Sequence, residues 1–340
     1  MLLAKIRLMD RMVPSDMKDQ ILEELKAEIE AHGTTEEKAC FYEVHAGILQ
    51  ELEDFAWWKV LESMKSKRLF FKKNPSKDFA IYSHFMEERI AVLRKWADHA
   101  QGESRLLAWG NLMAVLDVKE DREELSEVWV RAKSEVMELP EEKRQEILRL
   151  WLKQLVDHET DDEVSQAVTS KHLNNSVRLN RLYPLEPTMD GPTRHLFYRS
   201  MVQAYDFEGE DQIAVDWALK GMARLEAILE ADDLFLYLES VNQTVGLVDG
   251  RETECAKLVR CQWNLARDLD AYGSGVKLSM VLMNLALDDG REREANQQWD
   301  YLEGTIQKYG LSKLFNGREK DLKRWLDRLK RRLDQVNRSS

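Results

Sequence analysis

The residues with the most obvious potential for chemistry form an acidic cluster near the middle of the chain, where His158 and Glu159 precede Thr160-Asp161-Asp162-Glu163. Carboxylates and an imidazole held together could bind a metal ion or transfer protons. The cluster lies at a predicted turn before a helix, where acidic side chains stabilise the positive end of the helix dipole. We therefore expect these acids to have a structural role.

Other candidate groups have similar explanations. His45 and His84 fall near apolar residues, which favours core histidines over metal ligands. Cys255 and Cys261 would face different sides of one helix, so they predict neither a disulfide nor a shared metal site. The sequence contains no His-Glu-x-x-His, Cys-x-x-Cys, Gly-x-Ser-x-Gly or phosphate-binding glycine motif. We therefore predict no catalytic residues, no metal and no cofactor, and expect that the protein is not an enzyme.

A basic segment offers binding chemistry instead. Residues 64–77, MKSKRLFFKKNPSK, contain six Lys or Arg and no acid, and such a mixture of cations and rings suits phosphates and bases. The formal net charge of −12, with sixteen acids against eight bases in 115–163, opposes general binding to polyanions. Packing of both rings into the first hairpins is the alternative. The candidate nucleic-acid contacts are Lys65, Lys67, Arg68, Phe70, Lys72 and Lys73.

The C-terminal segment has the pattern of a basic amphipathic helix. Nine bases and four acids lie between Arg318 and Arg338, around an apolar stripe that starts at Leu322 and Trp325. Such a helix is typical of the end of a repeat array, where it covers the last repeat and keeps its charges in solvent. A membrane-surface or calmodulin-like site is the alternative. Its basic residues include Lys323, Arg324, Arg328, Lys330 and Arg331.

The elements that must position these residues are helices. Apolar residues recur at spacings of three and four along most of the 340 residues, and 15 Gly and 6 Pro are too few for the turns of a many-stranded sheet. No run reaches the roughly 18 apolar residues that span a bilayer, and the start lacks the order of a signal peptide. Together with three cysteines that we expect to be reduced, this predicts an intracellular protein, cytoplasmic in the first place, with an organelle or the nucleus as alternatives.

Internal repetition is the most informative feature. Residues 249–255 (DGRETEC) and 289–295 (DGREREA) share five of seven residues, and their glycines lie forty positions apart. A third copy begins at Gly209. Because an apolar helix precedes each glycine and another follows it, the pattern predicts helical hairpins of about forty residues that stack on one another. Further turns are expected near Lys119-Glu120, near Thr160 and near Glu53-Asp54.

These copies resemble the tetratricopeptide-like superfamily of helical hairpin repeats, in which a turn glycine is followed by a small residue and then an aromatic one. The matching positions are Ala286, Gly290, Ala295 and Trp299 in one copy, and Tyr205, Gly209, Ala214 and Trp217 in another. The period of about forty departs from the family's mid-thirties. Residues 108–132 and 148–164 are similar to half-tetratricopeptide repeats, and residues 41–69 to a pentatricopeptide repeat.

The resemblance implies an all-α fold, a right-handed α-solenoid of stacked antiparallel helical hairpins. We divide the chain into an N-terminal helical-repeat lobe (1–181), a Pro-containing loop or linker (182–193), C-terminal hairpin repeats (194–310) and a basic amphipathic capping helix (311–340). This organisation predicts a non-catalytic scaffold that binds a protein or peptide partner in a concave groove. The alternative is an RNA-binding or RNA-processing factor that uses the basic N-terminal-lobe patch. The first helices of hairpins should line the groove, at Asn111, Tyr205, Asn242 and Asn284.

Overall fold

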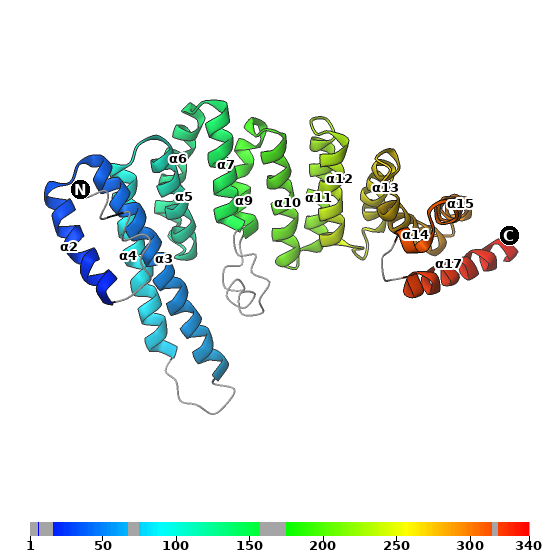
Figure 1. Ribbon diagram of the computed structural model, residues 1–340, viewed down its shortest axis with the longest axis horizontal. Coiled ribbons are helices and arrows are strands. Elements are labelled where there is room, and N and C mark those ends of the chain that lie inside the picture. Colours follow the sequence, from blue (N-terminus) through cyan, green and yellow to red (C-terminus); the bar gives the residue numbers. More distant parts are fainter. Residues whose placement is uncertain (1–5, 7–15, 67–74, 157–174, 315–318, 340) are drawn as a thin grey trace. The chain divides into compact units, whose positions relative to one another are not determined.

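The computed structural model describes residues 6, 16–66, 75–156, 175–314 and 319–339. These residues form helices and turns, with no β-strand among them. Successive helices pack against one another as antiparallel hairpins (Figure 1), which confirms the predicted all-α solenoid class. The chain divides into two compact units, unit 1 at Met1–Arg181 and unit 2 at Leu182–Ser340.

Unit 1 contains two long helices, α3 and α4, with shorter helices before and after them. Every helix from α2 to α7 contacts the next one along the chain. Their bounds are α2 Asp16–His32, α3 Thr35–Ser66, α4 Pro75–His99, α5 Gly102–Val118, α6 Arg122–Glu138 and α7 Glu141–Val156, and α9 Asn175–Leu182 ends at the boundary with unit 2.

The turn expected near Glu53-Asp54 is wrong, because α3 continues through these residues without a break. Glu53 is buried and accepts a hydrogen bond of 3.1 Å from the Arg89 guanidinium of α4. Trp57 and Val60 continue the same buried face toward α4. Glu53 thus forms a buried ion pair with Arg89 between two long helices. Neither Glu53 nor Asp54 is a helix-breaking residue.

The turn expected near Lys119-Glu120 is confirmed, since α5 ends at Val118 and α6 begins at Arg122. Glu120 takes a φ of 62°. The backbone N–H of Asp121, the next residue, donates to the Leu116 carbonyl at 3.0 Å, a bond that is typical of a left-handed helix end. The turn expected near Thr160 lies outside the described residues.

Unit 2 consists of three hairpins and a C-terminal helix. The hairpins are α10/α11 (Gly191–Phe207 and Asp211–Leu225), α12/α13 (Ala231–Val245 and Glu252–Asp268) and α14/α15 (Tyr272–Asp288 and Glu292–Tyr309). A 3₁₀ helix, η2 (Tyr183–Thr188), precedes them, and α16 (Leu311–Leu314) and α17 (Glu319–Ser339) follow. Leu185 and Met189 in the Pro-containing segment 182–193 are buried, so this segment packs into unit 2.

The three repeated glycines lie in the turns of the three hairpins, as the repeat predicts. Gly209, Gly250 and Gly290 have φ values of 75°, 80° and 68°. This left-handed conformation suits glycine, because a Cβ would crowd the backbone there. The chain can therefore reverse within a few residues and bring the two helices of a hairpin into contact.

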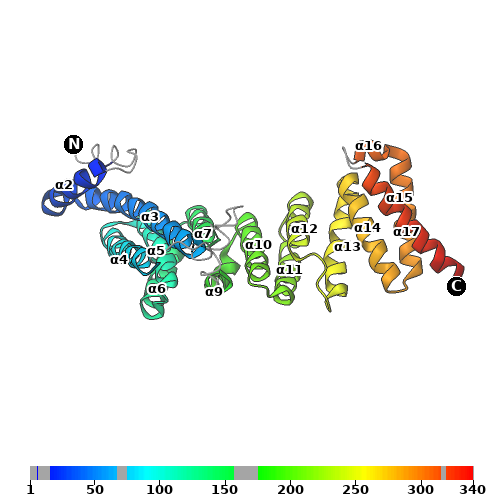
Figure 2. The ribbon, with the colours of Figure 1, turned by 90° about the horizontal axis from the view of Figure 1, so that it is seen from below.

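The last hairpin shares one apolar core with the C-terminal helix. Leu326, Leu329 and Leu333 of α17 are buried against α14 and α15, among residues that include Met283 and Leu302. Figure 2 shows α17 lying beside these two helices. The apolar stripe predicted for this helix thus covers the last hairpin. Trp325 is the exception, because it is 48% exposed and lies outside the buried face.

Close packing within unit 2 predicts that alanine substitutions at two glycines inside helices have opposite effects on stability. A Cβ on Gly221 would lie 2.7 Å from Cζ of the buried Tyr237, whose hydroxyl donates to the Ala218 carbonyl, whereas a Cβ on Gly304 would meet nothing within 4 Å. We expect Gly221→Ala to lower the free energy of unfolding by about 1–3 kcal/mol. The control Gly304→Ala should raise it by up to about 1 kcal/mol. Urea unfolding followed by circular dichroism measures both, and equal effects would contradict the packing.

The buried His45 of unit 1 predicts a pH-dependent stability. Burial, with Lys26 and Lys95 nearby, lowers the pKa of His45 to about 4, and its buried Nδ1 has no partner among the described residues. The unfolded chain binds a proton near pH 6.5 and the folded chain does not, so stability falls as the pH drops from about 6.5 to 4. We expect a loss of about 2 kcal/mol between pH 7.5 and 5, absent in His45→Leu.

The control for this experiment is the exposed His84. Unfolding free energies at both pH values should show the same pH dependence in His84→Leu as in the unaltered protein. A pH dependence that persists in His45→Leu would show that His45 is not its source.

Candidate binding cleft in unit 2

The middle hairpin of unit 2 differs from its neighbours at the end of its first helix. α10 and α14 end two residues before their turn glycines, whereas α12 ends at Val245, five residues before Gly250. Gly246 closes α12 with φ 54° and ψ −132°, a combination available essentially to glycine alone. The chain leaves the helix early, and Leu247 stays half exposed.

A cleft of about 290 Å³ lies where α12 stops short. Its walls come from the C-terminal half of α12 and the first turns of α14, and α13 contributes the residues between them. The lining residues are Glu239, Asn242 and Gln243 of α12, Gly246 and Leu247 of the connection, Val259 and Gln262 of α13, and Ser274, Lys277, Leu278 and Val281 of α14.

Two carboxamides provide the central polar groups of this cleft. Asn242 Nδ2 donates to Gln262 Oε1 at 2.7 Å. Asn242 Oδ1 is buried without a hydrogen-bond partner among the described residues. Gln262 is 3% exposed and lines the same cleft. The pair therefore leaves one buried acceptor, Asn242 Oδ1, without a partner.

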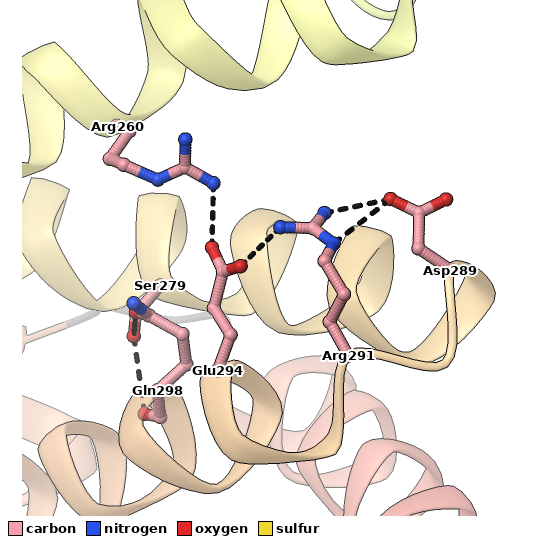
Figure 3. A network of polar contacts seen from close by, with 6 residues as sticks. All are labelled: Arg260, Ser279, Asp289, Arg291, Glu294 and Gln298. Carbon is pink, nitrogen blue, oxygen red and sulfur yellow. Dashed lines mark hydrogen bonds and ion pairs between the residues drawn. The ribbon is translucent and has the colours of Figure 1, made fainter.

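The next hairpin pairs its buried polar groups more completely. Ser279 Oγ donates to Gln298 Oε1 at 2.6 Å, and neither side chain holds a fully buried unpaired atom. Figure 3 shows this pair beside a network of charges. Glu294 accepts hydrogen bonds from Arg260 and Arg291, and Arg291 also pairs with Asp289 at 2.8 Å.

This network accounts for the repeated arginine and for the glutamate three residues after it. Arg251 pairs with Glu254 at 3.1 Å and reaches Asp216 of the preceding hairpin, as Arg291 pairs with Glu294 in its own copy. Arg-Glu pairs three residues apart stabilise their own helix, while the Arg251–Asp216 and Arg260–Glu294 pairs join neighbouring hairpins. The open surface depression at Arg260 and Gln298 is lined mainly by these paired charges, so we assign it a structural role.

The four predicted groove residues have different surroundings. Asn242 lines the cleft. Asn284 of α14 uses its whole amide within unit 2, because Nδ2 donates to Asp288 and Oδ1 accepts from Arg332 of α17. The Tyr205 ring of α10 stacks on Trp217, and Asn111 of α5, in unit 1, donates to the carbonyl of Leu107 on its own helix. The structure brings none of the other three to the cleft that Asn242 lines.

The predicted basic residues of α17 point away from its buried stripe. Lys323, Arg324, Arg328 and Arg331 are exposed. Lys330 is half-buried, with Nζ 4.9 Å from the centre of the Trp299 ring and 3.2 Å from Asp334. The candidate nucleic-acid contacts Lys67, Arg68, Phe70, Lys72 and Lys73 lie outside the described residues, as does the side chain of Lys65.

The sequence did not lead us to predict Gln262 as a residue of the site. A signal was present, because this glutamine interrupts the buried stripe that Cys255, Val259 and Ala266 form on α13. A polar residue at a core position needs a hydrogen-bond partner, and here that partner is Asn242. The sequence cannot show which atoms of such a pair remain unpaired.

Within the described part of the chain, no helix has both the length and the apolar character to cross a membrane. The same residues include no cluster of three or more His, Cys, Asp or Glu side chains that could ligate a metal.

Comparisons with known proteins add little to this geometry. No protein-family model matches the chain, and no curated protein sequence matches it. Among solved structures, the chain is similar to a circular tandem repeat protein with novel repeat topology and enhanced subunit contact surfaces, at 14% identity and a TM-score of 0.34, over 99% of this chain and 94% of that one.

The position of α17 predicts that alanine substitutions at two of its apolar residues have unequal effects on stability. Leu329 is 3% exposed in the core shared with α14 and α15, and Trp325 is 48% exposed. We expect Leu329→Ala to lower the free energy of unfolding by about 2–5 kcal/mol and to speed hydrogen exchange in α14. Trp325→Ala, the control, should change it by at most about 0.5 kcal/mol. Unchanged exchange in Leu329→Ala would show that α17 does not support the hairpin.

Proposed function

We propose that this chain is a non-catalytic, tetratricopeptide-like scaffold that binds a segment of a protein partner in the cleft between α12 and α14. The observation that carries the proposal is the cleft itself, an open space of about 290 Å³ with apolar walls and two central carboxamides. Carboxamides neither titrate near neutral pH nor act as nucleophiles, but they bind main-chain groups well. Their chemistry supports recognition.

The size of the cleft also favours binding of one part of a larger partner over binding of a small molecule. Pockets that enclose a small-molecule ligand usually measure about 300–1,000 Å³, and this cleft lies at the lower limit and is open. It suits one or two side chains of a segment whose remainder continues over the adjoining surface. The neighbouring Asn284 is held by Arg332, so we assign recognition to Asn242 and its surroundings.

RNA binding remains the alternative function, and one observation in unit 1 favours it. Phe55 and Trp58 of α3 are 55% and 44% exposed, and their rings stack with centroids 6.2 Å apart. Lys59 Nζ lies 4.5 Å from the centre of the Phe55 ring. Exposed rings beside a cation can stack on unpaired bases.

Site-directed photo-crosslinking tests the proposed function. A benzoylphenylalanine in place of Leu247, at the cleft, is compared with one in place of Ile213, an exposed apolar residue of α11. We expect defined protein adducts from position 247 in cell lysate, unchanged by RNase and absent from position 213. Equal adducts from both positions would show that the cleft is not the site. Adducts that disappear with RNase would favour the RNA-binding alternative.

A further inference from the structure

The C-terminal helix α17 has a second face, opposite its buried stripe, that the proposed scaffold function does not use. Five bases on this face follow one another at intervals of four, four, three and seven positions, which is the spacing of one side of a helix. All five are exposed. At a rise of about 1.5 Å per residue, they extend over about 27 Å. This basic stripe consists of Lys320, Arg324, Arg328, Arg331 and Arg338.

The charges of the basic stripe are little compensated within the protein. Two exposed acids, Asp321 and Asp327, flank the five bases. Asp321 lies 3.6 Å from Arg324, but both side chains are more than four-fifths exposed, and ion pairs in solvent contribute little. The other ion pairs of α17 within the described residues use Lys330 and Arg332, which lie outside the stripe. The stripe therefore presents an excess of positive charge to solvent.

The remainder of unit 2 carries the opposite charge. Residues 182–310 contain 23 acids against 12 bases. A flexible polyanion that wraps around the unit would be repelled by this acidic remainder. A flat anionic surface, in contrast, meets only the side that α17 presents. The distribution of charge therefore favours a flat partner over a flexible one.

Trp325 indicates which kind of anionic surface fits. Its side chain is half exposed beside the stripe, next to Arg324 and three positions before Arg328. An indole combines apolar rings with a polar N–H, and such side chains concentrate where lipid headgroups meet acyl chains. A single-stranded nucleic acid stacks its bases on successive rings, but Trp325 is the only aromatic residue of α17. A lipid surface therefore suits this helix better than a nucleic acid does.

We infer that α17 attaches the protein to the surface of a membrane that contains anionic phospholipids. The bases of the stripe contact headgroup phosphates and carboxylates, and clustered bases of this kind are drawn to anionic leaflets. A free amphipathic helix would insert its apolar face into the lipid, but in α17 that face is buried against α14 and α15. Contact therefore uses the opposite face, which the core holds in place before the membrane is met.

Sedimentation with phospholipid vesicles tests the inference on the full-length protein. The vesicles contain phosphatidylcholine alone, or phosphatidylcholine with one quarter phosphatidylserine. We expect the protein to sediment with the phosphatidylserine vesicles at about 0.1 M NaCl and to be released at about 0.5 M, because salt shortens the range of the charges. Vesicles of phosphatidylcholine alone should leave it in the supernatant.

A triple variant removes the centre of the basic stripe. Arg324→Gln, Arg328→Gln and Arg331→Gln together should lower the partition coefficient onto phosphatidylserine vesicles at least about tenfold. The matched control makes the same change in net charge elsewhere in unit 2 and should lower it by less than about threefold. It combines substitutions at three exposed bases of α13 and α15, namely Lys257→Gln, Arg293→Gln and Lys308→Gln.

A second pair of variants tests the indole. Trp325→Ala should weaken partitioning roughly threefold or more, although the ring lies outside the core. Leu236→Ala, which shortens an exposed apolar side chain of α12, is its control and should leave partitioning unchanged. Circular dichroism confirms that each variant is folded.

Three outcomes would overturn the inference. They are no sedimentation with phosphatidylserine vesicles, equal losses in the two triple variants, and unchanged partitioning of Trp325→Ala. Retention of a twenty-nucleotide single-stranded RNA that depends on the stripe, without binding to vesicles, would also overturn it and make a nucleic acid the occupant. The cleft between α12 and α14 is tested separately by the crosslinks from position 247, so either proposal can fail alone.

Discussion

The packing of each hairpin against the next is the interaction on which the rest of unit 2 depends. A single pair of amphipathic helices leaves one apolar face uncovered, and only a neighbour can bury it. Gly221 shows how close this contact is, because Tyr237 of the next hairpin occupies the space of its missing Cβ. The cleft lies where α12 ends, five residues before the turn glycine Gly250.

Much of this architecture could be predicted from the sequence, because its physical signals are local. The turn residues 209, 250 and 290 recur at fixed intervals, and left-handed turns favour glycine. The prediction failed at Glu53-Asp54, where a polar pair was taken for a turn but Glu53 instead meets Arg89 of another helix. A polar residue at a buried position needs a partner, but the residues around it do not reveal where along the chain that partner lies.

At the candidate site, too, the sequence predicted one residue and missed another. Asn242 lies on the first helix of its hairpin, as the repeat predicts, and it lines the cleft. Gln262 lies on the second helix and completes the site through a hydrogen bond across the hairpin. Asn284 occupies a comparable helix, but Arg332 from the end of the chain engages its amide. Periodicity predicts which helix a residue belongs to, whereas tertiary contacts decide whether its polar atoms remain available.

The C-terminal helix also changes the kind of surface that the last hairpin presents. The apolar faces of α14 and α15 that α17 covers are of a kind that associates with other apolar surfaces when exposed. α17 replaces them with a face that carries exposed Lys323, Arg324, Arg328 and Arg331. The helix thus exchanges an adhesive surface for a charged one, whose contacts with other charged molecules weaken as the ionic strength rises.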